Sequence, residues 1–291
     1  GTNYAIGLDD MGNATLDVNV TALNVTVKEN TSFVINVTDK FNGNVSIKVG
    51  DDVLYNGTVE ALVIGNILPV AGDKVATVVF YGDDNYDELT LNNVRFTVSR
   101  VTPEISVVVD DVTYPAKTVA TITVGNKANG TVNITVDGKK FKGTVTNGVG
   151  TIDLEGLSAG AKVASVEFFS TDDYSNNVTA SAKFNINKNT SGIGIDVKEL
   201  YKVGDDIVIT LTPVNSTGAV TVTINGKEYT VTNNVITIDG GLPAGEYIVN
   251  AVLAGDENYT GSGASKTFNV EKRDITVNLD EFNFINNGVY A

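Results

Sequence analysis

The sequence contains no cysteine, histidine, tryptophan or glutamine. Without cysteine the chain forms no disulfide and offers no thiolate to a metal ion. Without histidine and cysteine it lacks the commonest catalytic base, an activated thiol and the usual zinc ligands. The absence of tryptophan removes the largest aromatic surface on which a sugar could stack. No nucleophile elbow, zinc motif or phosphate loop is present either, so the sequence predicts a protein that is not an enzyme.

Long apolar runs are missing too. No stretch approaches the roughly 20 residues of a membrane helix, and no secretion signal stands at the first residue. We expect no direct membrane insertion in this segment and place any signal or anchor elsewhere in a longer protein. The acidic excess is large, with 35 Asp and Glu against 20 Lys and Arg. Such a surface repels phosphate backbones and anionic lipids, which argues against nucleic acid as a partner.

The chain is built on a repeat of about 88 residues. The segments "NGNVSIKV", "NGTVNITV" and "TGAVTVTI" begin at Asn42, Asn129 and Thr217, which are 87 and 88 residues apart. Later landmarks follow in the same order, including a turn with Leu and Gly and a closing Phe. The Phe landmarks are Phe96, Phe184 and Phe268. The sequence therefore predicts three consecutive copies of one unit.

Each unit has the pattern of β-structure. In "VTVTI" (residues 220–224) apolar and polar residues alternate, which is typical of a half-buried strand. Tight-turn pairs such as Asn225-Gly226, Asp137-Gly138 and Asn147-Gly148 follow the strand-like runs. Turn signals every 8–12 residues or so indicate roughly seven strands per unit. The predicted fold is all-β, with three tandem immunoglobulin-like sandwiches in an elongated array.

The predicted boundaries follow from the repeat. They are an N-terminal extension at 1–13, sandwiches at 14–100, 101–188 and 189–272, and a partial strand segment at 273–291. We expect a stiff linker at residues 100–103, because Pro103 holds the preceding residue extended. The linker at residues 188–192, "KNTSG", is predicted to be more flexible. "LPAGEY", ending at Tyr247, has the form of a tyrosine corner, with Val75 and Val163 near that position in the other units.

An acidic motif stands between the last two predicted strands of each unit, as "GDDNY" (82–86), "TDDYS" (171–175) and "GDENY" (255–259). The interpretation that we favour is a structural turn, in which Asp and Asn bond nearby backbone and Tyr covers the end of the sandwich. In that case the chain has no metal and no cofactor. Calcium is the alternative, because it takes six to eight oxygen ligands. Its candidate ligands are Asp83, Asp84, Asp87 and Asp256.

These motifs resemble the Ig-like repeats of adhesin-like surface proteins from methanogenic archaea, and related bacterial repeats. The third unit carries the resemblance best, with "TGAVTVTINGKEYTV", "LPAGEYIVNAVLAGDENY" and "KTFNV". The first unit replaces the "NGK" turn with "GDDVLY", and the second has "STDDYS" in place of "GDxNY". The resemblance covers about residues 14–272. It implies an extracellular location at the cell envelope and a structural role without catalysis.

Asn and Thr are abundant, and N-x-S/T sequons recur along the chain. Chance alone yields some of them in such a composition. The glycosylation candidates are Asn13, Asn30, Asn56, Asn129, Asn177, Asn189, Asn215 and Asn258. A Thr–Gln ester crosslink is excluded because there is no Gln, and no Lys–Asn pair stands out for an isopeptide bond.

The favoured function is therefore a non-catalytic structural or adhesive stalk that contacts other surface molecules, partner cells or further copies of itself. One alternative is a subunit of an extracellular filament, because "ITVNLDEFNF" near the end alternates like a strand but lacks the rest of its unit. Such a strand could pair with a neighbouring copy. The other alternative is a calcium- or carbohydrate-binding module.

Overall fold

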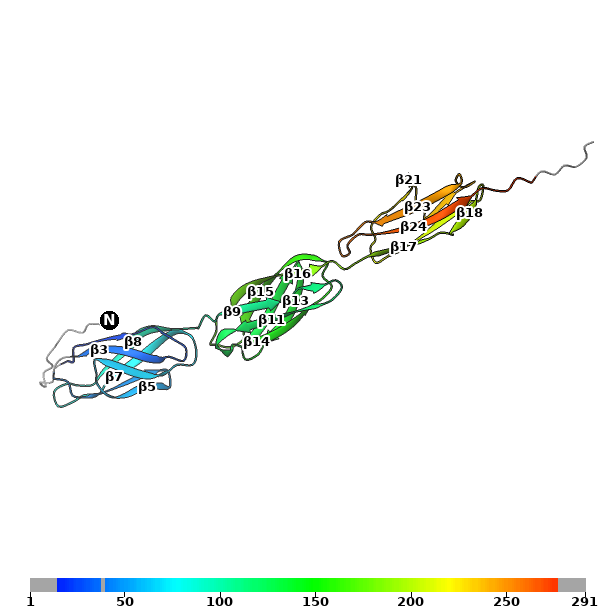
Figure 1. The fold of residues 1–291 in the computed structure, drawn as a ribbon. Coiled ribbons are helices and arrows are strands. Elements are labelled where there is room, and N and C mark those ends of the chain that lie inside the picture. The colour runs from blue at the N-terminus through cyan, green and yellow to red at the C-terminus, as the bar shows by residue number, and fades with distance from the viewer. Residues whose placement is uncertain (1–14, 38–39, 277–291) are drawn as a thin grey trace, which may run out of the picture. The chain divides into compact units, whose positions relative to one another are not determined.

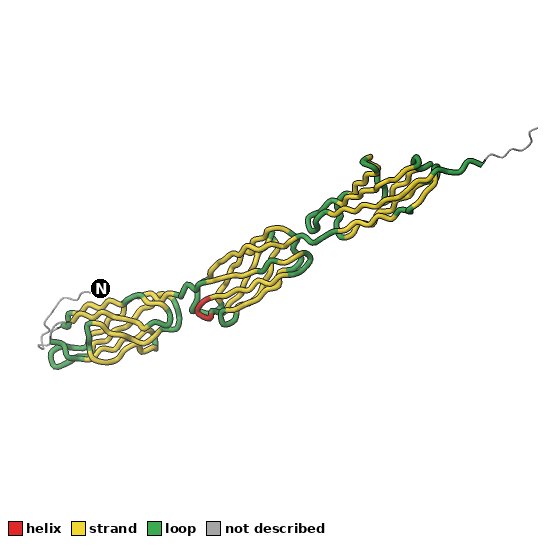
Figure 2. Tube along the Cα trace, in the orientation of Figure 1, coloured by secondary structure: helices red, strands yellow, loops and turns green. Residues whose placement is uncertain are grey.

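The computed structural model describes residues 15–37 and 40–276. Within these residues every regular element is a β-strand, apart from one turn of 3₁₀ helix at Gly125–Lys127 (Figures 1 and 2). The strands form six sheets, which follow one another along the chain as three pairs of a three-stranded and a five-stranded sheet. The chain is a tandem array of Ig-like β-sandwiches, so the predicted fold class is confirmed.

The first sandwich pairs a sheet of order β1-β3-β6 with a sheet of order β2-β8-β7-β4-β5. Its strands are β1 (Val18–Ala22), β2 (Val25–Thr26), β3 (Asn30–Val37), β4 (Asn44–Val49), β5 (Asp52–Thr58), β6 (Leu62–Ile67), β7 (Gly72–Phe80) and β8 (Leu89–Ser99). Phe33 from the smaller sheet meets Phe96 from the larger sheet edge to face, with ring centroids 5.7 Å apart. The alternating inward side chains of both sheets thus form one core.

The second sandwich pairs a sheet of order β14-β11-β9 with a sheet of order β10-β16-β15-β12-β13. Its strands are β9 (Ile105–Val109), β10 (Val112–Thr113), β11 (Thr118–Val124), β12 (Gly130–Val136), β13 (Lys139–Val145), β14 (Val149–Leu154), β15 (Gly160–Ser170) and β16 (Val178–Asn187). Ile122 on β11 and Ile134 on β12 are fully buried, as the alternating sequence predicts.

The third sandwich pairs a sheet of order β17-β19-β22 with a sheet of order β18-β24-β23-β20-β21. Its strands are β17 (Gly192–Asp196), β18 (Leu200–Lys202), β19 (Ile207–Val214), β20 (Val220–Ile224), β21 (Lys227–Tyr229), β22 (Val235–Ile238), β23 (Gly245–Leu253) and β24 (Ser262–Glu271). Phe268 packs here between Tyr201 and Tyr247, at centroid distances of 5.6 and 5.3 Å. The three Phe landmarks of the repeat are all buried, so they serve the cores.

Each sandwich has eight strands among the residues that the structure describes, where the sequence predicted roughly seven. The extra strands are β2, β10 and β18, which have two or three residues and pair in parallel with the last strand of their own sandwich. So short a strand shows no period-two alternation, so the sequence does not reveal it. The predicted hairpin turns are confirmed: Asn225-Gly226, Asp137-Gly138 and Asn147-Gly148 all have positive φ angles.

By backbone contacts the chain divides into two compact units. The first holds residues up to 110, 118–154 and 162–184, and the second holds 111–117, 155–161 and 185 onward. Two loops of the second sandwich therefore belong with the third. The residue boundaries at 100/101 and 188/189 stay predictions. The extension 1–13 and most of 273–291 lie outside the described residues. Among the described residues, no helix is long and apolar enough to cross a membrane.

Candidate functional site: the acidic loops

The acidic loops connect the last two strands of each sandwich, at residues 81–88, 171–177 and 254–261. In the first loop one carboxylate does most of the bonding. Asp83 Oδ1 accepts hydrogen bonds from the backbone N–H groups of Asn85 (2.8 Å) and Tyr86 (2.9 Å). Its Oδ2 accepts from Asn42 N at 2.7 Å, in the loop between β3 and β4. The aspartate therefore shapes its own turn and ties it to a second loop 41 residues earlier.

Asp256 repeats this arrangement in the third sandwich. Its Oδ1 accepts from Asn258 N and Tyr259 N, both at 2.9 Å. Its Oδ2 accepts from the backbone N–H and the hydroxyl of Thr217, at 2.8 and 3.2 Å. The local half of this network agrees with the predicted turn chemistry. The long-range half was not predicted, because the partner is a backbone N–H that any residue can supply.

Asp172 occupies the same position in the second sandwich. Its Oδ1 accepts from Tyr174 N (3.1 Å) and Ser175 N (2.8 Å), and its Oδ2 from Asn129 N (3.2 Å). The structural counterpart of Tyr86 and Tyr259 is therefore Ser175, and Tyr174 takes the place of an asparagine. The tyrosine of the second loop therefore stands one residue earlier, relative to its aspartate, than the tyrosines of the other two loops. The second loop is also one residue shorter than the other two, since it spans residues 171–177 where they span 81–88 and 254–261.

These hydrogen bonds lower the pKa of all three carboxyl groups. At Asp83 the main cause is the Asn42 N–H, followed by the Asn85 N–H. At Asp256 the N–H groups of Thr217 and Asn258 lower the pKa to about 2. Partial burial opposes ionisation at Asp172, but the bonds from Ser175 and Asn129 outweigh it and the pKa still falls. All three carboxylates are therefore ionised near neutral pH.

The calcium candidates can now be placed. Asp83 and Asp256 direct their carboxylate oxygens at backbone N–H groups of their own sandwiches. Asp84 and Asp87 lie exposed on the first acidic loop. Among the described residues, no three Asp or Glu side chains come together at a spacing that would hold a metal ion. Calcium binding stays a prediction, and the architectural role of Asp83 and Asp256 accounts for their positions.

The predicted tyrosine corner is present in the third sandwich, where Tyr247 Oη donates to Pro243 O at 2.9 Å. Its counterparts in the other sandwiches are Lys74 and Lys162, and not Val75 and Val163. Tyr247 pairs with Phe268 as Lys74 pairs with Phe96. Lys162 is only 7% exposed and its Nζ lies 2.6 Å from Asp137 Oδ2 in a hairpin turn. A lysine stem thus fills the place of the tyrosine ring.

The sequon residues differ in how their amides are used. The Oδ1 atoms of Asn129, Asn177, Asn189 and Asn258 each accept a backbone hydrogen bond, whereas the Nδ2 atoms of Asn30 and Asn215 donate to carbonyls. Asn56 lies exposed within strand β5. Asn258 is half-buried, with its Oδ1 bonded to Ala159 N at 2.9 Å. Asn13 lies outside the described residues.

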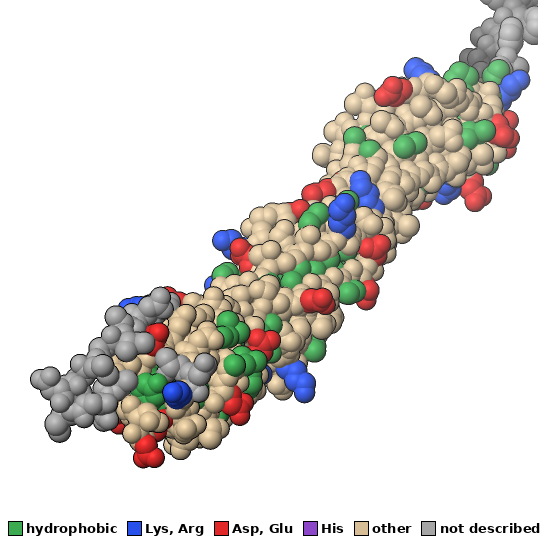
Figure 3. Space-filling view, turned by 90° about the vertical axis from the view of Figure 1, so that its left-hand side faces the viewer, with side chains coloured by type: hydrophobic (Ala, Val, Ile, Leu, Met, Phe, Trp, Pro, Cys, Tyr) green, Lys and Arg blue, Asp and Glu red, His purple; other side chains and the backbone are tan. Residues whose placement is uncertain are grey.

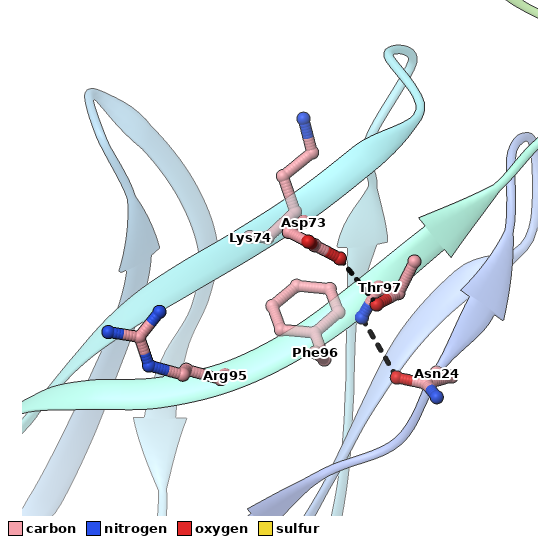
Figure 4. Close-up of a pocket in the computed structure, with 6 residues that line it drawn as sticks. All are labelled: Asn24, Asp73, Lys74, Arg95, Phe96 and Thr97. Carbon is pink, nitrogen blue, oxygen red and sulfur yellow. Dashed lines mark hydrogen bonds between the residues drawn. The ribbon is translucent and has the colours of Figure 1, made fainter.

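An open groove crosses the first sandwich near the start of β7 and the end of β8 (Figure 4). It is lined by Asn24, Asp73, Lys74, Arg95, Phe96 and Thr97. Thr97 donates its backbone N–H to Asn24 Oδ1 and its hydroxyl to Asp73 Oδ1, both at 2.8 Å. Asp73 supplies the carboxylate that lines this groove. On the face shown in Figure 3, acidic and basic side chains lie interspersed.

No protein-family model matches the chain, and no curated protein matches its sequence. Solved structures with a similar fold include a tetra-tandem repeat from the extending region of a large adhesion protein. It is 18% identical, with 86% of this chain and 74% of that chain covered and a TM-score of 0.43. The I9–I11 tandem of titin is 14% identical, with coverages of 88% and 100% and a TM-score of 0.27. The chicken CNTN1 FN1–FN3 domains are 12% identical, with coverages of 87% and 98% and a TM-score of 0.26. These likenesses concern the fold alone.

Proposed function

We propose that this chain is a non-catalytic structural and adhesive protein of the cell surface, whose tandem sandwiches extend and present adhesion surfaces. The use of the acidic loops carries the proposal. In all three sandwiches the most conspicuous polar motif directs its carboxylate at backbone N–H groups of the same sandwich. These carboxylates already accept hydrogen bonds from the protein's own backbone. Carboxylates used in this way suit a scaffold better than a reaction centre.

The finer identity proposed is a repeat region of an adhesin-like protein of the methanogen type, extracellular and held at the cell envelope. The motif resemblance of the third sandwich supports it. Its partners would be other surface molecules, neighbouring cells or further copies of itself. Glycosylation at exposed sequons such as Asn56 and Asn177 would suit this location.

Antibodies against the purified chain test this function directly. We expect them to label intact cells of the source organism, and a strain lacking the gene to lose the label and to adhere less to surfaces or to other cells. The matched control is antibody against a known internal protein, which should label only permeabilised cells. Labelling of this chain only after permeabilisation would contradict the surface role.

A filament assembled by strand donation is a second candidate. The observation that favours it is Ile275, an apolar residue that follows β24 and is 89% exposed. It opens the alternating segment "ITVNL", which could add to the open edge of a sheet in a second copy. Analytical ultracentrifugation of the full chain and of a chain ending at Lys272 would test this. Assembly of the full chain alone supports strand donation, and a monomer in both cases contradicts it.

A further inference from the structure

A basic residue follows the last strand of each sandwich at the same place. Arg100, Lys188 and Lys272 each lie four residues after the buried Phe of that strand. In the first two cases this basic residue is the first residue of the linker to the following sandwich, and Val101 or Asn189 is the second. The acidic loops of the second and third sandwiches lie against these two linkers.

At the first linker the contacts are mainly those of backbone groups. Val101 N donates to Tyr174 O at 2.9 Å, and Asn176 N donates to Val101 O at 2.8 Å. Val101 therefore pairs in parallel with Ser175, as a strand would. Beside it, Arg100 Nη2 lies 3.1 Å from Asp173 Oδ1 on the same loop. Both backbone polar groups of Val101 are thus bonded to the acidic loop.

The second linker repeats this pattern with different side chains. Asn189 N donates to Asn258 O at 3.0 Å, and Thr260 N donates to Asn189 O at 2.8 Å. Lys188 Nζ donates to the carbonyl of Asp256 at 2.5 Å. The flexibility predicted for "KNTSG" stays a prediction, and in the structure the backbone N–H and carbonyl of Asn189 are both hydrogen-bonded, as those of Val101 are. The common feature of the two linkers is the backbone pairing, which does not depend on side-chain identity.

The tips of these two acidic loops also touch the sandwich before the linker. Lys28 Nζ lies 3.7 Å from the centre of the Tyr174 ring, a cation–π contact. Tyr114 meets Tyr259 edge to face at 5.6 Å, and Ala159 N donates to Asn258 Oδ1. Each of these contacts lies within one compact unit. Lys28 and Tyr174 both belong to the first unit, and the loops that carry Tyr114 and Ala159 belong to the second unit together with the third sandwich.

We propose that the acidic loops of the second and third sandwiches are latches, each of which holds the linker ahead of it and so limits bending at that joint. Asp172 and Asp256 act as positioning residues, because their carboxylates fix the loop shape that presents Tyr174 O, Asn176 N, Asn258 O and Thr260 N to the linker. The inference rests on the proposed scaffold function and adds to it. The stiffness of the chain is set in the loops and not in the linker composition.

Spin labels test the latch, because the chain has no cysteine of its own and accepts labels only where cysteine is introduced. Asn56→Cys with Lys140→Cys spans the first joint, and Lys140→Cys with Glu228→Cys spans the second; all three positions are exposed. Distance distributions are measured by pulsed electron spin resonance. We expect Asp172→Asn to broaden the first distribution and leave the second unchanged, and Asp256→Asn to do the reverse. Each variant is thus the control for the other.

Two further variants separate the latch from the stability of the sandwich. Tyr174→Ala and Asn258→Ala leave both aspartates in place and remove only the contacts of the loop tip, so we expect a smaller broadening at the matching joint with an unchanged thermal midpoint. Distance distributions that keep the same width in all four variants would overturn the latch. Neither result would affect surface labelling of intact cells, so the proposed function is judged separately.

Discussion

At the residue scale the account depends on Asp83, Asp172 and Asp256. Each carboxylate satisfies two N–H groups of its own turn and one of a distant loop. Hydrogen bonds to an ionised acceptor are stronger than those between neutral groups, and a backbone N–H left without a partner destabilises the fold. One aspartate in each loop is therefore worth more to the fold than its exposed neighbours Asp84 and Asp173.

The depressed pKa of Asp256 predicts a dependence of stability on pH. Its pKa is 3.8 without these hydrogen bonds and about 2 in the folded chain. A carboxyl with a lower pKa in the folded state stabilises the fold above its unfolded pKa, and this contribution is lost as pH falls through the folded pKa. We expect the thermal midpoint of the third sandwich to fall between pH 3.8 and about 2. Carboxyl-carbon NMR should show Asp256 titrating at about pH 2.

The matched variant is Asp256→Asn, which keeps the shape of the side chain but cannot ionise. We expect it to lower the thermal midpoint by a few degrees near neutral pH. We also expect the midpoint to fall less steeply as the pH is lowered than it does in the unchanged chain. Asp239→Asn, on the exposed turn after β22, is the control and should retain the full decline. Equal acid sensitivity in all three chains would show that Asp256 does not carry this effect.

The tyrosine corner gives a second prediction at this scale. Tyr247→Phe removes the hydroxyl that bonds Pro243 O and keeps the ring stacked on Phe268. We expect a loss of about 1 kcal/mol in the unfolding free energy of the third sandwich, as for a typical single hydrogen bond. Chemical denaturation measures it. Tyr81→Phe, on a ring that is 40% exposed, is the control and should change the free energy little.

At the scale of the element, the strands and hairpins could be predicted from the sequence. Residues 220–224 alternate and form β20, and Asn225-Gly226 turns into β21. The short strands β2, β10 and β18 could not be predicted, because two or three residues carry no period. The sequence also could not show that Lys162 takes, in the second sandwich, the position that Tyr247 has in the third. A lysine that buries its aliphatic chain and pairs its charge cannot be told from a surface lysine by sequence alone.

The turn at Gly226 tests the assignment of the hairpins. Gly226 has a φ of +83°, and no atom lies within 4 Å of the place that a Cβ would take. An alanine at this position would therefore strain the backbone without clashing with a neighbour. We expect Gly226→Ala to destabilise the third sandwich by roughly 1–2 kcal/mol. Gly192→Ala, at a residue with negative φ and open surroundings, is the control. An equal and small effect of both changes would contradict the assigned turn.

At the scale of the whole molecule, the repeat predicted tandem sandwiches, each with a core of its own. Phe268 is 1% exposed and contacts two tyrosines of its own sandwich. We expect Phe268→Ala to destabilise that sandwich by about 3–5 kcal/mol, as in other buried cores. Hydrogen exchange should then show lost protection over residues 207–271 and unchanged protection over residues 30–99. Phe169→Ala, at a side chain that is 38% exposed, is the control. Simultaneous loss of protection throughout the chain would contradict independent cores.

The acidic loops are architectural in this account, and a calcium titration followed by amide NMR tests that claim most directly. The amides of Asn85, Tyr86, Tyr174, Ser175, Asn258 and Tyr259 report on the three aspartates. The account predicts that their resonances and exchange rates are the same in millimolar calcium and in excess chelator, because the carboxylates already accept these N–H groups. Saturable shifts at these six amides, with a higher thermal midpoint in calcium, would show an ion-binding loop and contradict the account.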